Sequence, residues 1–157
     1  YVLPILKKYN VPATLFIVGS YIDKKGYLTK SQLIELSKES LVEIGNHSFK
    51  LHNLSRDELI RKVTSISGIE MMEKDYSQNS DYLYKTTNIR PVTVSYPYGV
   101  SSTFIEGVLR QQGVKATFST RFGDNRYISF NLPFNRINRA NSSEIDALVK
   151  SAALVSR

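Results

Sequence analysis

Cysteine is absent from this 157-residue chain, and only two histidines occur in it. Without cysteine the chain can form no disulfide and offers no thiolate to a metal ion, which fits a cytosolic protein or a bacterial exported one. No apolar stretch approaches the roughly 20 residues needed to cross a bilayer. The composition therefore excludes a disulfide scaffold, a thiolate metal centre and a transmembrane span within this sequence.

Negative charge is in the minority, since 21 Lys and Arg stand against 14 Asp and Glu, for a net charge of +7. Such an excess attracts polyanions such as nucleic acid, anionic lipid or an acidic wall polymer. The basic residues form short separate groups, for example Lys7-Lys8 and Lys24-Lys25, without a dense run interleaved with aromatic residues. We therefore expect a solvated basic surface and no nucleic-acid partner.

The length suits one domain or most of a larger one, and 41% hydrophobic with 22% charged residues is ordinary for a globular chain with a buried core. The sequence begins with Tyr1, inside a predicted helix over 2–9. We expect a single, N-terminally incomplete domain that is a processed or excised product. The absence of a targeting segment then carries little weight.

Apolar runs rich in β-branched and aromatic residues predict strands, and amphipathic stretches between them predict helices. The predicted strands cover 13–18, 41–45, 91–96 and 115–119, with another near 136–138. The predicted helices cover 2–9, 29–40, 55–74 and 101–112, with a last one opening at Asn141 or Ser142. Residues 75–90 are polar and rich in tyrosine, and we expect only a short helical turn at their end. Strands without polar alternation that are separated by helices predict a parallel sheet, either doubly wound or barrel-like.

Two helix starts carry clear capping signals. Thr29 precedes one predicted helix, and Ser55 precedes another with Glu58 three residues later, the pattern of a capping box. The adjacent carboxylates Asp57 and Glu58 are therefore assigned to the helix start rather than to catalysis. The apolar face expected of the second helix is Leu59, Ile60, Val63, Ile66, Ile69 and Met72.

The two histidines, His47 and His52, stand five residues apart directly after the predicted strand 41–45. Neutral imidazole is the commonest protein ligand of transition metals. A spacing of five turns the two rings apart on a straight helix, so they converge only where the backbone bends. Asn46 and Ser48 can orient the loop and the ring through hydrogen bonds. We therefore predict a metal-binding pair at the carboxyl end of a strand, where parallel α/β folds place their chemistry. Two partly exposed histidines without a role are the alternative.

Three segments resemble the motifs of the polysaccharide deacetylases, the NodB-like carbohydrate esterases. The string Asn46-His47-Ser48-x-x-x-His52 is similar to the second motif of that family, and Ser95-Tyr96-Pro97-Tyr98-Gly99 to its third. Residues 3–16 look like the segment after the first motif. Weaker similarity follows at 113–118 and 134–137, so the likeness runs along nearly the whole chain in the expected order.

The resemblance implies a distorted (β/α) barrel that removes N-acetyl groups from a cell-wall or extracellular polysaccharide. It also implies a divalent metal ion, most often zinc, with His47 and His52 as its imidazole ligands. By motif position Tyr98 would be a catalytic residue, because its backbone N–H would stabilise the oxyanion. Pro97 would shape the same loop around the substrate. Arg136 could supply a cation to the substrate, although a packing or surface role is the simpler interpretation. The family also implies a secreted or cell-surface bacterial protein.

The chain departs from the family pattern at four points. The first motif, Thr-Phe-Asp-Asp-Gly, which carries the catalytic base and the metal-binding Asp, is expected upstream of Tyr1. No third histidine can act as general acid, and the histidines are spaced by five instead of four. Ser95 stands where many members have Arg. We therefore expect this chain alone to be inactive or nearly so.

Two other functions remain open on the sequence. One is a non-catalytic carbohydrate-binding relative in which the first motif was truly lost, and the other is a metal-free module that binds an acidic wall polymer. Tyr76, Tyr82 and Tyr84 could stack on sugar rings or fill the core. An absent first strand would leave a sheet edge exposed, and such an edge could pair two chains into a homodimer.

Overall fold

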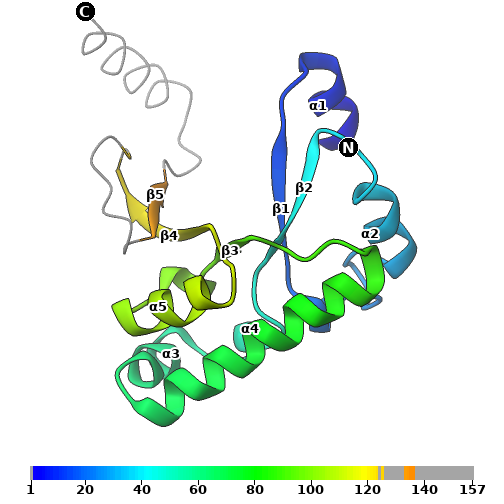
Figure 1. Cartoon of the computed structure of the whole chain (residues 1–157). Coiled ribbons are helices and arrows are strands. Elements are labelled where there is room, and N and C mark those ends of the chain that lie inside the picture. The colour runs from blue at the N-terminus through cyan, green and yellow to red at the C-terminus, as the bar shows by residue number, and fades with distance from the viewer. Residues whose placement is uncertain (1, 124, 126–132, 137–157) are drawn as a thin grey trace, which may run out of the picture.

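The computed structural model describes residues 2–123, 125 and 133–136 (Figure 1). The helix predicted to open at Asn141 or Ser142 lies outside the described residues. One five-stranded sheet organises this described part of the chain. Its strands are β1 (Ala13–Ile17), β2 (Val42–Asn46), β3 (Thr93–Ser95), β4 (Ala116–Phe122) and β5 (Phe134–Arg136). All five predicted strands are therefore present, with ends that shift by at most three residues.

The sheet is parallel throughout, and its strands follow one another in chain order, β1-β2-β3-β4-β5. A doubly wound sheet would instead reverse its strand order at a switch point. A sequential parallel order is that of a barrel wall, in which each crossover advances in the same direction. The prediction of an α/β fold of the distorted-barrel type is confirmed, and the doubly wound alternative does not apply to these strands.

The sheet is curved, as two aromatic rings demonstrate. Phe16 on β1 and Phe118 on β4 lie with ring centroids 5.5 Å apart. Three strand spacings separate β1 from β4, which is about 14 Å along a flat sheet. The rings can meet only because both point into the concave side of a rolled sheet. Phe134 on β5 stacks on Phe118 at 5.4 Å and extends the row.

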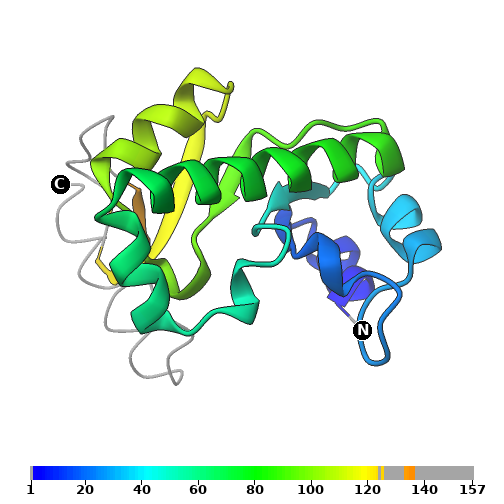
Figure 2. The same cartoon turned by 90° about the horizontal axis from the view of Figure 1, so that it is seen from below.

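In the described ranges five α-helices and three short 3₁₀ turns flank the strands (Figures 1 and 2). The helices are α1 (Val2–Tyr9), α2 (Lys30–Leu36), α3 (Arg56–Val63), α4 (Ile66–Thr87) and α5 (Thr103–Gln111). The turns are η1 (Gly19–Tyr21), η2 (Leu51–Asn53) and η3 (Pro97–Gly99). The long helix α4 packs against α2, α3 and α5 and also touches β2 and η1. It is thus the element that ties the two halves of the described chain together.

Capping residues fix three helix starts where the sequence predicts them. Thr29 and Ser55 each form a full capping box, with Gln32 and Glu58 respectively, and the Ser102 side chain accepts a hydrogen bond from the Ile105 N–H at the start of α5. The end predicted for α2 at residue 40 is wrong, because the helix stops at Leu36.

The long helix predicted over 55–74 is wrong in two respects. The chain breaks at residues 64–65, where the Ser65 side chain caps a new helix by accepting a hydrogen bond from Gly68 N. Gly68 lies so close to the end of α3 that an added Cβ would stand 2.2 Å from the Lys62 carbonyl oxygen. The second helix, α4, then continues to Thr87. The loop expected over 75–90 is therefore mostly helix.

The core has two parts. Leu51, Leu59, Met72, Tyr96 and Leu109 belong to the larger cluster, between α3, α4, α5 and the sheet. A smaller cluster of Ile17, Leu33, Ile44 and Leu83 lies under α2 and the far end of α4. Two members of the predicted apolar face are exposed instead, since Ile66 at the break is 80% accessible and Ile60 37%.

The first strand forms one edge of the described sheet, because β1 pairs with β2 and with no other strand in the described ranges. Next to it, α1 presents Val2, Ile5 and Tyr9 to solvent. Homodimerisation through this edge stays a prediction. Among the helices that the structure describes, none combines the length and the apolar composition needed to cross a bilayer.

Candidate metal-binding site at the strand ends

His47 directly follows β2 and is held at three points. Its backbone N–H donates to the Ile17 carbonyl oxygen at 3.0 Å, and its Nδ1 lies 2.7 Å from the Ser95 carbonyl oxygen at the end of β3. A carbonyl only accepts, so Nδ1 carries the proton and Nε2 is left with a free lone pair. Phe16 packs beside the ring, with centroids 6.4 Å apart. The neighbouring strands thus fix both the tautomer and the direction of His47.

Gly45 makes room for this arrangement. It pairs with Phe16 across β1 and β2, and an added Cβ would come within 2.6 Å of the Phe16 ring. Since Cβ contacts below 3.0 Å are essentially never seen, only glycine lets the Phe16 ring lie across β2 beside His47.

His52 returns to the same point from the η2 turn. Its Nε2 lies 2.9 Å from the Nε2 of His47, with ring centroids 4.5 Å apart. The chain between them bends sharply, because Ser48 adopts the left-handed conformation with φ +74°. The convergence expected of the two histidines is therefore present in the structure.

Burial lowers the pKa of the His47 imidazole below its ordinary value, while the hydrogen bond to Ser95 raises it in part. Burial also lowers the pKa of His52, and the neighbouring His47 lowers it further. Both effects favour neutral imidazole, the form that binds metal ions.

The donor set fits a nitrogen-binding divalent metal ion. Two Nε2 lone pairs that point at each other would repel unless a proton or a cation lay between them, and the fixed tautomer of His47 supplies one of these lone pairs. Across the residues that the structure describes, no third His, Cys, Asp or Glu joins the pair in a cluster that could hold a metal. Two imidazoles would make up only part of a catalytic zinc site, since such a zinc usually takes three protein ligands.

The Pro97-Tyr98-Gly99 turn, η3, lies beside the histidines. The Tyr98 ring packs on the His52 ring with centroids 5.2 Å apart, and Tyr98 is 41% exposed. Tyr98 has φ +53°, and Gly99 follows with φ +70°. A non-glycine residue held at positive φ costs about 1 kcal/mol or more, which the surrounding structure must compensate. Within the described ranges the Tyr98 N–H donates to no protein acceptor, so it is free to meet a ligand.

The structure places Pro97 in a buried position at the start of this turn, where it fixes the backbone before Tyr98. Arg136 forms the last residue of β5. Its side chain lies outside what the structure describes, so its predicted contact with substrate stays a prediction.

Three buried polar residues near the site escaped the sequence analysis. Asp75 and Asn79 on α4 bind the loop that carries the histidines, and Glu106 on α5 binds the Tyr96 hydroxyl just before η3. All three have less than 5% of their surface exposed. The one sequence signal for them is polar residues at core-facing positions of a helix, which requires the helix to be known first.

Glu58 and the tyrosines that the sequence offered as further candidates lie away from the paired histidines or serve the fold. Glu58 closes the capping box of α3, as predicted. Tyr76 is buried in the core, whereas Tyr84 is 45% exposed on α4. Tyr82 meets Phe49 edge to face, with ring centroids 5.9 Å apart.

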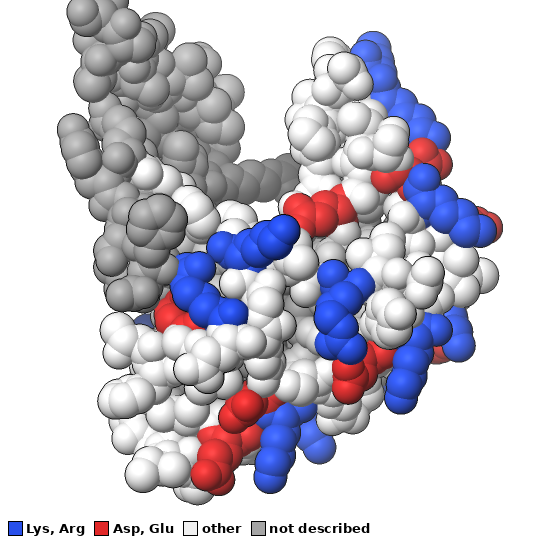
Figure 3. All heavy atoms as spheres, viewed as in Figure 1, with Lys and Arg blue, Asp and Glu red and all other residues white. Residues whose placement is uncertain are grey.

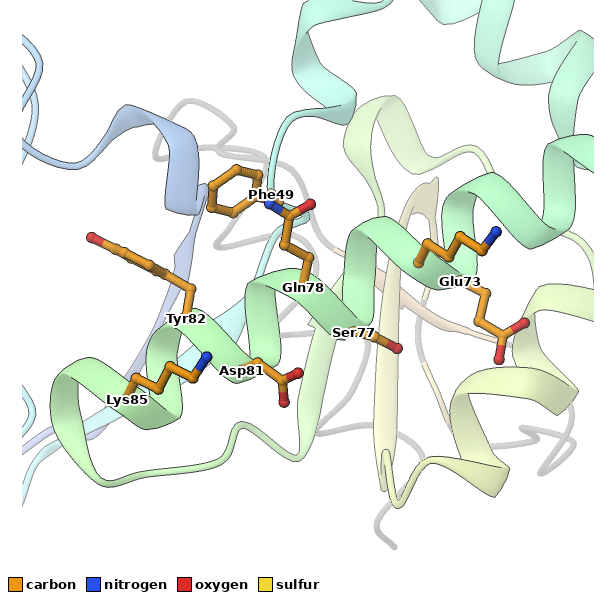
Figure 4. A pocket seen from close by; sticks show the side chains of 8 residues that line it. Phe49, Glu73, Ser77, Gln78, Asp81, Tyr82 and Lys85 are labelled. Carbon is orange, nitrogen blue, oxygen red and sulfur yellow. The ribbon is translucent and has the colours of Figure 1, made fainter.

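A hollow of about 610 Å³ lies on α4 outside the paired histidines (Figure 4). Phe49, Gln78 and Tyr82 lie along it on the side of the histidine loop, and Lys85 lies near its end. None of the predicted site residues lines this hollow. On the face seen in Figure 3, basic side chains lie between acidic ones and form no continuous positive surface.

Comparison with known proteins identifies the family. The family model "Polysaccharide deacetylase" matches residues 1–117. The poly-beta-1,6-N-acetyl-D-glucosamine N-deacetylase of Staphylococcus aureus strain MSSA476 is 33% identical over 121 residues, which cover 74% of this chain and 41% of that protein. The chain thus spans less than half the length of this curated relative.

Solved structures share the fold. The structure of IcaB from Ammonifex degensii superposes with a TM-score of 0.75 at 19% identity and covers 94% of this chain and 65% of its own. A de-N-acetylase from Aggregatibacter actinomycetemcomitans gives a TM-score of 0.73 at 20% identity, over 93% of this chain and 68% of its own. With the family model matched over three quarters of the sequence, the chain belongs to the polysaccharide deacetylase family.

Proposed function

We propose that the protein removes N-acetyl groups from an N-acetylglucosamine polysaccharide, as the name of its staphylococcal relatives indicates for them. The observation that carries the proposal is the 2.9 Å separation of the His47 and His52 Nε2 atoms at the end of β2. Two imidazoles converge there beside a backbone N–H with no protein acceptor in the described ranges, that of Tyr98. These groups are the part of an amide-hydrolysing site that polarises the carbonyl group.

In this proposal His47 and His52 hold a divalent metal ion through their Nε2 atoms, and nitrogen donors of this kind suit zinc. The metal ion, when bound, supplies Lewis-acid polarisation and lowers the pKa of water. The Tyr98 N–H donates to the carbonyl oxygen as negative charge develops on it. Pro97 holds that loop in place, and Arg136 contacts the polysaccharide.

The reaction is hydrolysis of an acetamide. The oxygen of water bonds to the acetyl carbon, the C–N bond breaks, and the sugar nitrogen takes a proton as acetate leaves. A carboxylate must accept the proton of the water. None of the described Asp or Glu residues joins the histidine pair in a ligand cluster. We therefore infer that the base and the third ligand come from an Asp-Asp motif upstream of Tyr1, and that the 157 residues alone are inactive or nearly so.

The site of action follows from the substrate. A polysaccharide of this kind lies outside the cell, so the enzyme acts as a secreted or cell-surface bacterial protein. The gene sequence upstream of Tyr1 is the first check, because an Asp-Asp pair there supports catalysis and its absence favours the non-catalytic carbohydrate-binding alternative.

Acetate release from a β-1,6-linked N-acetylglucosamine oligomer tests the proposal. The longer gene product that carries the motif should release acetate only with a divalent metal ion, and His47→Ala should abolish the release. Lys85→Ala, an exposed change on α4, is the matched control and should leave the rate unchanged. Undiminished release by His47→Ala would exclude the assigned ligand. Substantial metal-dependent release by the 157-residue chain would contradict its inactivity.

A further inference from the structure

The two histidines are positioned by different means. His47 is fixed directly, through its backbone N–H and its Nδ1. His52 touches the Nε2 of His47 and the Tyr98 ring, and no described residue accepts a hydrogen bond from its Nδ1. The position of the His52 ring therefore depends on the backbone that carries it from β2 to η2.

That backbone is strained at Ser48, which has φ +74°, and it is held from one side. The N–H groups of three successive residues are bound by side chains. Ser48 N–H donates to Asn46 Oδ1 at 2.8 Å, Phe49 N–H to Asp75 Oδ1 at 2.7 Å and Lys50 N–H to Asp75 Oδ2 at 3.1 Å. One carboxylate thus binds two adjacent N–H groups in the middle of the loop.

Asp75 is well suited to hold this loop in place. It is 4% exposed, and its two oxygens accept from two adjacent N–H groups of one backbone segment. Charge-assisted hydrogen bonds are roughly twice as strong as neutral ones and are more directional. Asp75 also belongs to the middle of the 22-residue helix α4, which is tied to the rest of the fold at several places.

One turn further along α4, Asn79 holds the start of the same loop. Its Nδ2 donates to the Ile17 carbonyl oxygen and to Asn46 Oδ1, both at 2.8 Å. Asn46 Nδ2 in turn donates to the Tyr76 carbonyl oxygen on α4 at 2.9 Å. The loop is therefore held against one polar face of α4, at its beginning by Asn79 and in its middle by Asp75.

We propose that Asp75 is a positioning residue that sets the place of His52 relative to His47 and thereby tunes the affinity of the pair for a divalent metal ion. The inference rests on the proposed function, since it requires the pair to bind metal. If Asp75 served stability alone, its loss would lower the free energy of unfolding and leave the metal affinity of the folded chain unchanged.

Zinc titration of the 157-residue chain, followed through the imidazole NMR signals of His47 and His52, tests the proposal. Loss of a group that orients a ligand typically weakens metal binding 10- to 100-fold. Asp75→Ala should therefore raise the dissociation constant at least tenfold. Asp75→Asn keeps one acceptor oxygen and should give a smaller increase. Amide hydrogen exchange should show faster exchange at Phe49 and Lys50 in both variants.

Glu106→Gln is the matched control, because it alters the other buried carboxylate without touching the histidine loop. It should lower stability and leave the zinc affinity within twofold of the original chain. Unchanged zinc affinity in folded Asp75→Ala would overturn the proposal. Should that variant not fold, unchanged affinity in Asp75→Asn together with faster exchange at Phe49 and Lys50 would overturn it equally. Failure of the proposed function looks different, since His47→Ala would then bind zinc as tightly as the unaltered chain.

Discussion

Removal of the Glu106 carboxylate should destabilise the fold strongly, because two hydroxyls depend on it. Glu106 is 1% exposed, and its Oε1 accepts from the Tyr96 hydroxyl at 2.7 Å and from Thr117 Oγ1 at 2.7 Å. Burial raises the pKa of Tyr96 far above its ordinary value, and Glu106 raises it further, so the phenol stays a donor. Arg110 lies 3.7 Å away and is partly solvated, so it adds little.

Glu106→Ala leaves two buried hydroxyls without an acceptor, each at a cost of about 1–3 kcal/mol, and opens a cavity. We expect a loss of about 3–5 kcal/mol in the free energy of unfolding. Glu106→Gln retains an acceptor oxygen and should lose about 1–2 kcal/mol. With a urea m-value of about 2 kcal/mol/M, the Ala variant should move the unfolding midpoint by about 2 M, measured by circular dichroism.

The exposed change Glu35→Ala on α2 serves as the control and should stay within about 0.5 kcal/mol of the original chain. A loss below about 1 kcal/mol in Glu106→Ala would refute the reasoning, because it would mean that water or a rearranged neighbour satisfies both hydroxyls. A double-mutant cycle with Tyr96→Phe would then show how much of the remaining energy belongs to that pair.

Three further changes probe other parts of the fold. Within the described structure the buried Tyr76 hydroxyl has no partner, so Tyr76→Phe should be neutral or stabilising by about 1 kcal/mol. Burial also raises the pKa of Tyr76 above its unfolded value near 10. The protein is therefore not destabilised by ionisation of Tyr76 below pH 10, but it loses stability as the pH rises further, because the phenol ionises more readily in the unfolded chain. Tyr76→Phe should resist alkaline unfolding better than the original chain, and equal sensitivity of the two proteins would exclude Tyr76 ionisation as a cause of alkaline unfolding. Gly99→Ala should lower the melting temperature more than Gly113→Ala. Both glycines have positive φ, +70° and +90°, but a Cβ added at Gly99 would lie 2.2 Å from Thr120 Oγ1, whereas Gly113 has open space around it. Equal shifts in melting temperature would contradict this steric argument. Ser55→Ala should cost about 1 kcal/mol through loss of the cap of α3, and an unchanged melting temperature would show that the cap contributes nothing.

Local signals were sufficient for the strands and for most helix starts. Runs such as 13–17 and 42–46 are mostly apolar, and the exposed Glu43 is the one strongly polar interruption on their outer side. The caps at Thr29 and Ser55 depend on contacts three residues apart, so the sequence shows them directly. Since His47 and the η3 turn each follow a predicted parallel strand, the sequence predicts that both lie at the same edge of the sheet.

The sequence does not predict that helix α4 continues from residue 75 to 87, because the buried face of this helix is partly polar. Beyond residue 74 its buried side chains include Asp75, Asn79 and Tyr76, which face the polar histidine loop as well as the apolar core. Hydrophobic periodicity cannot recognise a helix whose buried positions are filled with hydrogen-bonding groups. The partners of Asp75 and Asn79 lie 25 to 62 residues earlier in the chain, so only the tertiary structure shows why these two side chains are buried.

The two loops that carry the proposed site share one construction principle. The loop after β2 contains Ser48 at positive φ, and Asp75 binds the N–H groups that follow it. The turn after β3 contains Tyr98 at positive φ, and Glu106 binds the hydroxyl of Tyr96, two residues earlier. Each carboxylate belongs to a helix that packs on the sheet, and each costs desolvation energy that an apolar residue would not. Apolar replacements could fill the same space, but they could not bind the N–H or O–H groups that define the two bends. The buried carboxylates therefore make the conformations of the two loops specific. Of the two loops only the one bound by Asp75 carries the histidines, so the metal affinity should respond to Asp75, whereas loss of Glu106 should lower the free energy of unfolding.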